Sequence, residues 1–138
     1  MPDDAGSLKY ILREPFERAS KSLHRSLTSR GLRSIGQVDL ARRVEQYLGI
    51  VLPPCKIVFV LPGPSLFKSA SVDPRAALFL PLHIVLSSNE TETSIDIQNR
   101  VHADPRADGP KLVAPIGKAQ AQLSDAIEAV AMRSNLCL

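Results

Sequence analysis

The stretch from Cys55 to Leu86 decides the fold, and it reads CKIVFVLPGPSLFKSASVDPRAALFLPLHIVL. Its two apolar runs, Ile57–Leu61 and Ala76–Leu86, are separated by a Pro-Gly-Pro turn and a short segment that ends at Asp73-Pro74. Apolar runs of this length that are bounded by Pro and Gly are typical of buried strands. The uninterrupted run Ile57–Leu61 indicates a central strand that is buried on both faces or lies at a well-covered position.

Two amphipathic helices are predicted before this stretch. The first opens at Glu14-Pro15 and ends at Gly31, which suits a left-handed cap, and its apolar residues recur at helical spacing: Phe16, Ala19, Leu23 and Leu27. The second is capped by Asp39 and ended by Gly49, and its apolar stripe comprises Leu40, Val44, Tyr47 and Leu48. Short strands at Leu8–Leu12 and Leu32–Val38 flank the first helix in this interpretation.

The sequence from Pro64 onward predicts a short helix, a hairpin and a final helix. Pro64 can start a helix through Ser71, and Pro81 introduces a bend before a hairpin that covers Leu82–Ile97. The second hairpin strand alternates cleanly, with Ile95 and Ile97 on one face. The result is one compact α+β domain, a mostly antiparallel sheet covered by helices, in the approximate order β-α-β-α-β(short α)-β-β-α. Its parts are a core at 8–97, a polar loop at 98–118, a C-terminal helix at 119–133 on the same domain, and loose termini at 1–7 and 134–138.

Composition narrows the class of protein. The chain has 138 residues, of which 44% are hydrophobic, so one domain with its own core is expected. Aromatic residues are only 4% and Trp is absent, which argues against a surface that stacks nucleic-acid bases. The start, MPDDAGSLKY, lacks the regions of a signal peptide, and no apolar run approaches the ~20 residues of a membrane span. We therefore expect a cytoplasmic protein without a membrane segment.

No metal or cofactor is expected from the residues. Cys55 and Cys137 are the only cysteines, too few for a disulfide framework or a thiolate metal site. His102, Asp104 and Asp108 lie close together but match no known metal-ligand spacing.

The order of elements resembles a known family. From about Glu14 to Ile97 the chain is similar to the bacterial and archaeal domain of unknown function 302. The matching features are Arg30-Gly31, Val38-Asp39-Leu40, Tyr47-Leu48-Gly49, the hydrophobic strand with its turn ending at Pro64, Asp73-Pro74 and Phe79-Leu80-Pro81. The resemblance implies a compact α+β domain with an antiparallel sheet covered by helices, and it implies no settled activity.

Two departures from the family concern its cysteines. Family members carry a Cys-Asn-Pro turn after the central strand and a Leu-Pro-Cys-Asn segment at the later strand. The corresponding segments here read Pro62-Gly63-Pro64 and Leu80-Pro81-Leu82-His83. Neither Cys55 nor Cys137 matches the missing positions, so any thiol chemistry of relatives is expected to be absent or altered.

The resemblance places a candidate contact site for a ligand or partner at this turn. The residues concerned are Pro62, Gly63, Pro64, Leu82 and His83. His83 is a polar residue in an apolar strand, and it can act either as an anchor in a small pocket or as a hydrogen-bonded structural residue. No Ser, Cys or Asp partner for a catalytic triad is identifiable from the sequence, so no catalytic residue is assigned.

A second candidate surface is basic. Between Lys9 and Lys56 there are ten Lys or Arg residues against four acids. Those on the predicted helix faces could contact an anionic partner, although a basic helix face is more often simply solvated: Arg18, Lys21, Arg25, Arg42 and Arg43.

Three functions stay open on these observations. The first is a non-enzymatic module that binds a ligand or partner near the Pro62–Pro64 turn. The second is an enzyme with a degenerate family site at His83, which requires a second titratable group within hydrogen-bond reach. The third is a binder of phosphate or nucleic acid through the basic helix faces, the least favoured of the three. Homo-oligomerisation through a strand edge near Ile95 is a further alternative.

Overall fold

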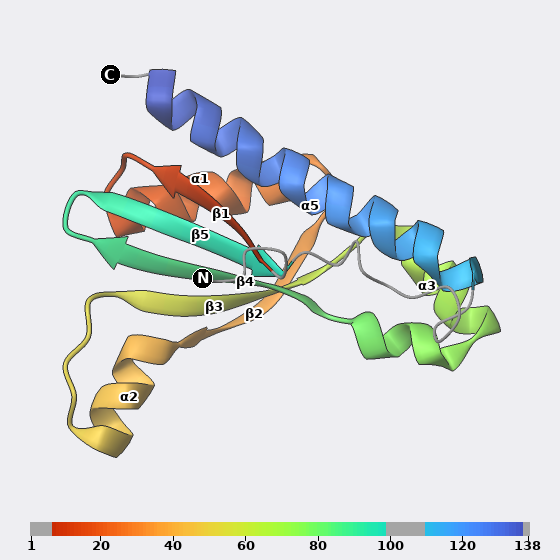
Figure 1. The fold of residues 1–138 in the computed structure, drawn as a ribbon, viewed down its shortest axis with the longest axis horizontal. Helices are drawn as coiled ribbons and strands as arrows, with labels where there is room; N and C mark the ends of the chain where they lie inside the picture. The colour runs from red at the N-terminus through yellow and green to blue at the C-terminus, as the bar shows by residue number, and fades with distance from the viewer. Residues whose placement is uncertain (1–6, 99–109, 137–138) are drawn as a thin grey trace.

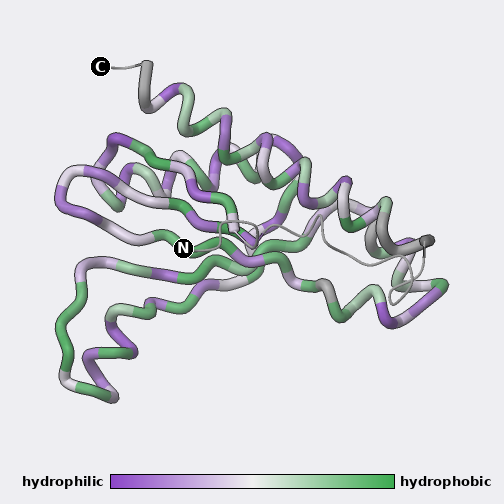
Figure 2. Tube along the Cα trace, in the orientation of Figure 1, coloured by the Kyte–Doolittle hydropathy of each residue, from purple (hydrophilic) through white to green (hydrophobic). Residues whose placement is uncertain are grey.

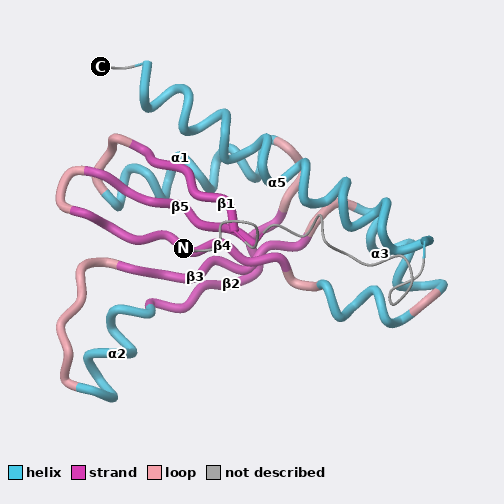
Figure 3. The backbone as a smooth tube through the Cα atoms, in the orientation of Figure 1, coloured by secondary structure: helices cyan, strands magenta, loops and turns pink. Residues whose placement is uncertain are grey.

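The protein is an α+β domain built on one five-stranded antiparallel sheet (Figure 1). The computed structural model describes residues 7–98 and 110–136. Figure 3 separates the strands from the helices that surround them. In chain order the elements are β1 (Ser7–Leu12), α1 (Phe16–Ser29), β2 (Arg33–Asp39), α2 (Leu40–Leu48), β3 (Cys55–Leu61), α3 (Pro64–Val72), the 3-10 helix η2 (Pro74–Phe79), β4 (Leu82–Asn89), β5 (Glu92–Gln98) and α5 (Pro110–Leu136).

The strands lie in the order β1-β5-β4-β3-β2, so β1 and β2 are the edges. The predicted hairpin is confirmed as β4 and β5, which pair through Ile84↔Ile97 and Leu86↔Ile95. Because β5 lies between β1 and β4, Ile95 is fully buried and lies in an internal strand. The expected strand edge near Ile95 is therefore wrong.

One face of the sheet is covered by α1 and α5, and the core lies between these two layers (Figure 1). Alternation along the strands directs Leu12, Val58, Ile84 and Ile95 toward the helices, and all four are fully buried. A buried hydrogen bond of 2.7 Å, from Ser26 Oγ to the Ala126 carbonyl oxygen, joins the two helices. The layered arrangement is what an amphipathic sheet and amphipathic helices require in order to bury their apolar faces together.

The opposite face, here called the open face, is covered by none of the described helices. In β3, Ile57, Phe59 and Leu61 point to this face and are only partly buried, whereas Val58 and Val60 are fully buried. The prediction that β3 is buried on both faces therefore holds, among the described residues, for the helix-covered face alone.

Local signals account for the ends of α1. Gly31 has φ 75°, and its N–H donates to the Thr28 carbonyl at 3.1 Å while Leu32 N–H donates to the Leu27 carbonyl at 3.0 Å. These two bonds form a Schellman motif, which satisfies carbonyls at the helix end. Pro15, expected at the first helical position, is instead the N-cap, so α1 begins one residue later at Phe16.

The C-terminal helix is longer than predicted. Helix α5 begins at Pro110, so 110–118 is helical and not part of a polar loop. Pro110, Pro115 and Gly117 lie in this first part, and Pro and Gly normally interrupt helices. Ile116 and Ala119 are nonetheless buried against the core, and this packing holds the first half of the helix in place.

Two other segments differ from expectation. The apolar run that begins at Ala76 contains the 3-10 helix η2 before the bend at Pro81, and only Leu82–Asn89 is a strand. Helix α2 has its predicted boundaries at Asp39 and Gly49, but no residue of it is buried. Its apolar stripe therefore does not pack into the core of its own chain.

Candidate functional site

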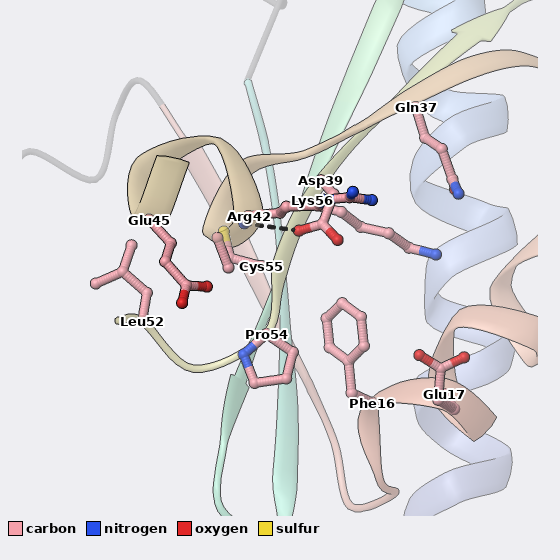
Figure 4. Close-up of a pocket in the computed structure, with 11 residues that line it drawn as sticks. Phe16, Glu17, Gln37, Asp39, Arg42, Glu45, Leu52, Pro54, Cys55 and Lys56 are labelled. Atoms are coloured by element: carbon pink, nitrogen blue, oxygen red, sulfur yellow. Dashed lines mark hydrogen bonds between the residues drawn. The ribbon is translucent and has the colours of Figure 1, made fainter. Parts of the chain in front are cut away.

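A pocket of about 470 Å³ lies between the start of α1 and the start of α2, over the adjoining ends of β2 and β3 (Figure 4). Its size falls within the range of small-molecule sites, about 300–1,000 Å³. The lining comes from three separate segments of the chain: Phe16, Glu17, Gln37, Asp39, Ala41, Arg42, Glu45, Leu52, Pro54, Cys55 and Lys56.

Strand β2 continues directly into α2, and this junction forms one wall of the pocket. Asp39 ends the strand and caps the helix, because its Oδ1 accepts a 3.0 Å hydrogen bond from Arg42 N–H. The cap fixes the first turn of α2 and so places Arg42 and Glu45 along the pocket (Figure 4).

Lys56 extends into the pocket from β3 on the helix-covered side. Its Nζ donates a hydrogen bond to Ser20 Oγ of α1 and lies 5.7 Å from the centroid of the Phe16 ring. A cation over an aromatic face is attracted by the ring quadrupole. Among the described residues no carboxylate lies within ion-pair distance of Lys56, so its charge is held by a hydroxyl and a ring alone.

Lys56 also interacts electrostatically with His24, which follows Ser20 by one helical turn. Burial lowers the pKa of His24 below its usual 6.5, and the positive charge of Lys56 lowers the pKa further. Both causes disfavour the imidazolium, so His24 is neutral at pH 7. The site therefore carries one partly buried cation beside a neutral imidazole.

Cys55 lies beside the pocket but is not an activated thiol. Burial raises the pKa of its thiol above the usual 9.0, and the negative charges of Asp39 and Asp96 raise the pKa further. A nucleophilic cysteine needs the opposite environment, one that favours the thiolate. At neutral pH Cys55 is therefore a protonated, weakly reactive thiol.

The residues predicted at the Pro-Gly-Pro turn are divided between the two faces of the sheet. Pro62 and Leu82 are buried on the core side, and a Cβ placed on Gly63 would lie 4.0 Å from Gln122 Oε1 of α5. His83 pairs with Phe59 of β3, and alternation directs its side chain to the open face. Pro64 is exposed at the start of α3.

The alternative of an enzyme at His83 required a second titratable group within hydrogen-bond reach. His83 is partly buried, and within residues 7–98 and 110–136 no hydrogen bond or ion pair joins it to another side chain. Among these residues, the partner that general acid–base catalysis needs is therefore not found.

The five basic residues lie on two separate helices. Arg18, Lys21 and Arg25 are exposed on α1, and Arg25 lies near Arg133 of α5 in a shallow depression. Arg42 and Arg43 belong to α2, which projects away from the sheet where β2 ends and β3 begins (Figure 1). The structure thus forms two small basic areas and not one continuous surface.

Metal ligands are not gathered among the described residues. No group of three or more His, Cys, Asp or Glu side chains there could hold a metal ion. His102, Asp104 and Asp108, considered above for their proximity in sequence, lie outside the described part of the chain. Within that part, no helix combines the length and apolar composition that are needed to span a membrane.

The pocket residues Lys56 and Phe16, and Ser20, which accepts the hydrogen bond of Lys56, were not identified from the sequence as site residues. One signal could have found Lys56. It is the only charged residue in β3, and its even numbering with Val58 and Val60 directs it to the buried side of the sheet. A lysine in such a position needs a partner or a function.

Comparisons with known proteins agree with the fold. The model of the family "Domain of unknown function DUF302" matches residues 8–130. A crystal structure of an uncharacterised conserved DUF302 protein from Bacillus stearothermophilus superposes with a TM-score of 0.77 at 15% sequence identity, covering 88% of this chain and 95% of that one. No match was found among curated proteins. Because the family model spans most of the chain, the protein belongs to the DUF302 family.

Proposed function

We propose that the protein is a non-enzymatic binding module, and that its ligand is a small molecule with one acidic group and an apolar portion. The pocket between α1 and α2 is the binding site. The observation that carries this proposal is the Lys56 ammonium, which lines the pocket without a carboxylate partner among the described residues.

An acidic group fits this environment because it could accept a direct hydrogen bond from the Lys56 ammonium, which none of the described carboxylates does. Charge-assisted hydrogen bonds are shorter and stronger than neutral ones, and they are strongest where water is partly excluded. The Phe16 ring, Leu52 and Pro54 form an apolar part of the lining. A ligand that joins a carboxylate to a flat apolar group could use both features.

The acidic residues of the lining restrict the ligand further. Glu17, Asp39 and Glu45 oppose the two cations Arg42 and Lys56. A polyanion such as a nucleic-acid backbone would meet like charges here, and this repulsion favours a ligand with a single acidic group. The same balance disfavours the nucleic-acid alternative at this site.

Binding is favoured over catalysis by the state of the titratable groups beside Lys56. The Cys55 thiol has a raised pKa and is not nucleophilic at neutral pH. His24 contacts no described carboxylate through a hydrogen bond or an ion pair, so no acid–base pair is assembled. A free thiol at Cys55 also supports a reducing compartment such as the cytoplasm.

Titration with benzoate, followed by ¹H–¹⁵N correlation spectra, tests the site. We expect benzoate to shift the amides of residues 16–20, 37–45 and 54–56, and the uncharged analogue benzamide to leave them in place. Lys56→Met should raise the dissociation constant for benzoate about tenfold or more, because a hydrogen bond to a charged group is worth about 1.5–3 kcal/mol.

Lys68→Met is the matched control, since Lys68 is an exposed lysine of α3 and does not line this pocket. It should leave benzoate binding unchanged. Equal binding of benzoate by the Lys56→Met variant, or shifts confined to other parts of the protein, would contradict the proposal.

A further inference from the structure

Helix α2 contributes no buried residue to the core, and its last turn presents large apolar side chains to solvent. Ala41, Arg42 and Glu45 line the pocket described above, and Leu40 and Val44 are partly buried. In the last turn, Tyr47 is 76% exposed and Leu48 is 67% exposed. A surface helix of a globular protein normally turns such residues toward its own core.

The apolar exposure continues past the helix. Ile50, Val51 and Leu52 follow directly and are 50%, 77% and 40% exposed, and Figure 2 shows this segment as a hydrophobic stretch at the far end of the molecule. We call residues 40–54 the α2 arm. An apolar surface of this extent on a soluble domain marks an interaction site.

The α2 arm is anchored at both of its ends. It begins at the Asp39 cap, and Pro54 at its other end accepts a 2.9 Å hydrogen bond from Ser88 N–H of β4. A helix of nine residues is marginal by itself in water, so packing on Tyr47 and Leu48 would stabilise α2 further. None of the described elements supplies that packing.

The open face of the sheet is a second apolar surface without a cover among the described residues. Ile57, Phe59 and Leu61 of β3 lie there, beside Val85 of β4, and each is only partly buried. An uninterrupted apolar strand is typical of a sheet that is covered on both faces. The natural cover for a sheet face is a helix with an apolar stripe.

We propose that two copies of this chain form a symmetric dimer in which the α2 arm of each copy lies across the open face of the other. A second copy supplies both missing partners at once, a helix for the sheet and a sheet for the helix. Twofold symmetry closes the assembly after two chains, because each arm is used by one partner.

A specific interface buries about 800 Å² on each partner. In the symmetric arrangement each chain contributes its arm and its open face, so the arm-to-face contact is made twice. The aromatic Tyr47 provides an anchor of the kind that dominates interface energetics.

Charges beside the two surfaces are complementary. Arg43 flanks the apolar stripe of α2 and is exposed. Asp96 and Glu92 of β5 alternate onto the open face and are partly buried there, with Lys9 of β1 opposite Asp96. We place Arg43 of one chain next to Asp96 of the other, where an ion pair would fix the register of the arm.

Sedimentation equilibrium of the full chain over a range of concentrations tests the dimer. The chain mass is 15.0 kDa, and we expect the fitted mass to approach twice that value. Leu48→Glu places a charge in the proposed interface and should raise the dimer dissociation constant at least tenfold. Leu78→Glu is the control, because Leu78 is 78% exposed on η2, away from both surfaces, and should leave the constant unchanged.

A charge exchange tests the arm-to-face geometry. Arg43→Glu and Asp96→Arg should each weaken the dimer several-fold, and the double variant should recover most of the loss. Circular dichroism of each variant establishes that it is folded, so that a loss of dimer is not a loss of fold.

Three results would overturn the proposal. The wild-type chain could stay monomeric at all concentrations, the Leu48→Glu chain could dimerise as well as wild type, or the charge exchange could show no recovery. Binding of the monomeric chain to vesicles of anionic lipid, abolished by Leu48→Glu, would instead assign the α2 arm to a membrane surface.

Discussion

At the scale of single residues, the interactions of Lys56 set the chemistry of the pocket. The Lys56 ammonium donates a hydrogen bond to Ser20 and lies near the face of the Phe16 ring. Its positive charge also lowers the pKa of His24. A partly buried lysine is costly unless its charge is compensated. The proposed acidic ligand would add to this compensation, and the pKa of the neighbouring His24 responds to the Lys56 charge.

Lys56→Met should raise the pKa of His24. Burial, the larger cause of the lowered pKa, remains in this variant, so the value should rise without reaching 6.5. An NMR titration of the imidazole Cε1–H signal measures the change, and Lys68→Met serves as the control. An unchanged pKa in Lys56→Met would show that Lys56 does not act on His24.

The same shift predicts a pH dependence of stability. The pKa of His24 lies below 6.5 in the folded chain and is about 6.5 in the unfolded chain. Between these two pKa values the unfolded chain therefore binds more protons than the folded chain. The contribution of His24 to stability is complete above 6.5 and falls as the pH decreases through this window. Urea unfolding of the wild type and of His24→Gln, compared across the window, should show a smaller loss in the variant.

At the scale of elements, helix ends are determined by local signals and helix faces are not. The Schellman motif at Gly31 and the Asp39 cap of α2 appear where short-range chemistry indicates them. The direction in which α2 turns its apolar stripe depends on the path of β2 and β3, which no signal within the helix specifies. This distinction explains why α2 has the predicted boundaries but not the expected burial.

Gly31→Ala should lower the free energy of unfolding by about 1 kcal/mol, because an L-residue is strained at positive φ. Gly36→Ala is a matched control. An added Cβ meets no atom within 4 Å at either position, and only Gly31 has a positive φ. Urea denaturation of both variants checks the prediction, and equal stabilities would mean that the left-handed conformation is not the cause.

At the scale of the whole molecule, one layer of helices on one sheet face supplies the core. The contact between α5 and the sheet is central to it, since Leu123, Ile127 and Val130 are all buried. Helix α5 tolerates Pro115 because the packing of its neighbours outweighs the local cost of a proline in a helix.

Leu123→Ala should destabilise the protein by about 2–5 kcal/mol, through lost burial and the cavity that remains. Leu78→Ala removes the same atoms from an exposed position and should change the stability by less than about 0.5 kcal/mol. Thermal and urea unfolding measure both. Similar effects for the two leucines would contradict the assignment of α5 to the core.

Much of the fold could be predicted because its signals are local. The alternation of Thr93, Ile95 and Ile97 identified β5, and the spacing of Ala19, Leu23 and Leu27 identified the buried side of α1. The start of α5 was missed for the opposite reason. Pro115 and Gly117 interrupt a helix locally, and only contact with the core overrides them.

The pocket could be predicted far less well than the fold. Ser20 and Lys56 are 36 positions apart and meet only when α1 packs on β3. The resemblance to the family predicted a contact site at the Pro62–Pro64 turn and His83. In the structure Leu82 and His83 point to opposite faces of the sheet. Contacts between distant segments leave no pattern in either segment.

The sequence by itself determined the elements, their order and the α+β class, because caps, turns and apolar periodicity act over a few residues. Only the tertiary structure decided that Cys55–Leu86 presents Lys56 to a pocket on one side and an open apolar face on the other. It also decided that the last turn of α2 leaves Tyr47 and Leu48 exposed. These features depend on how distant segments are placed in space, and that placement follows from the packing of the whole chain.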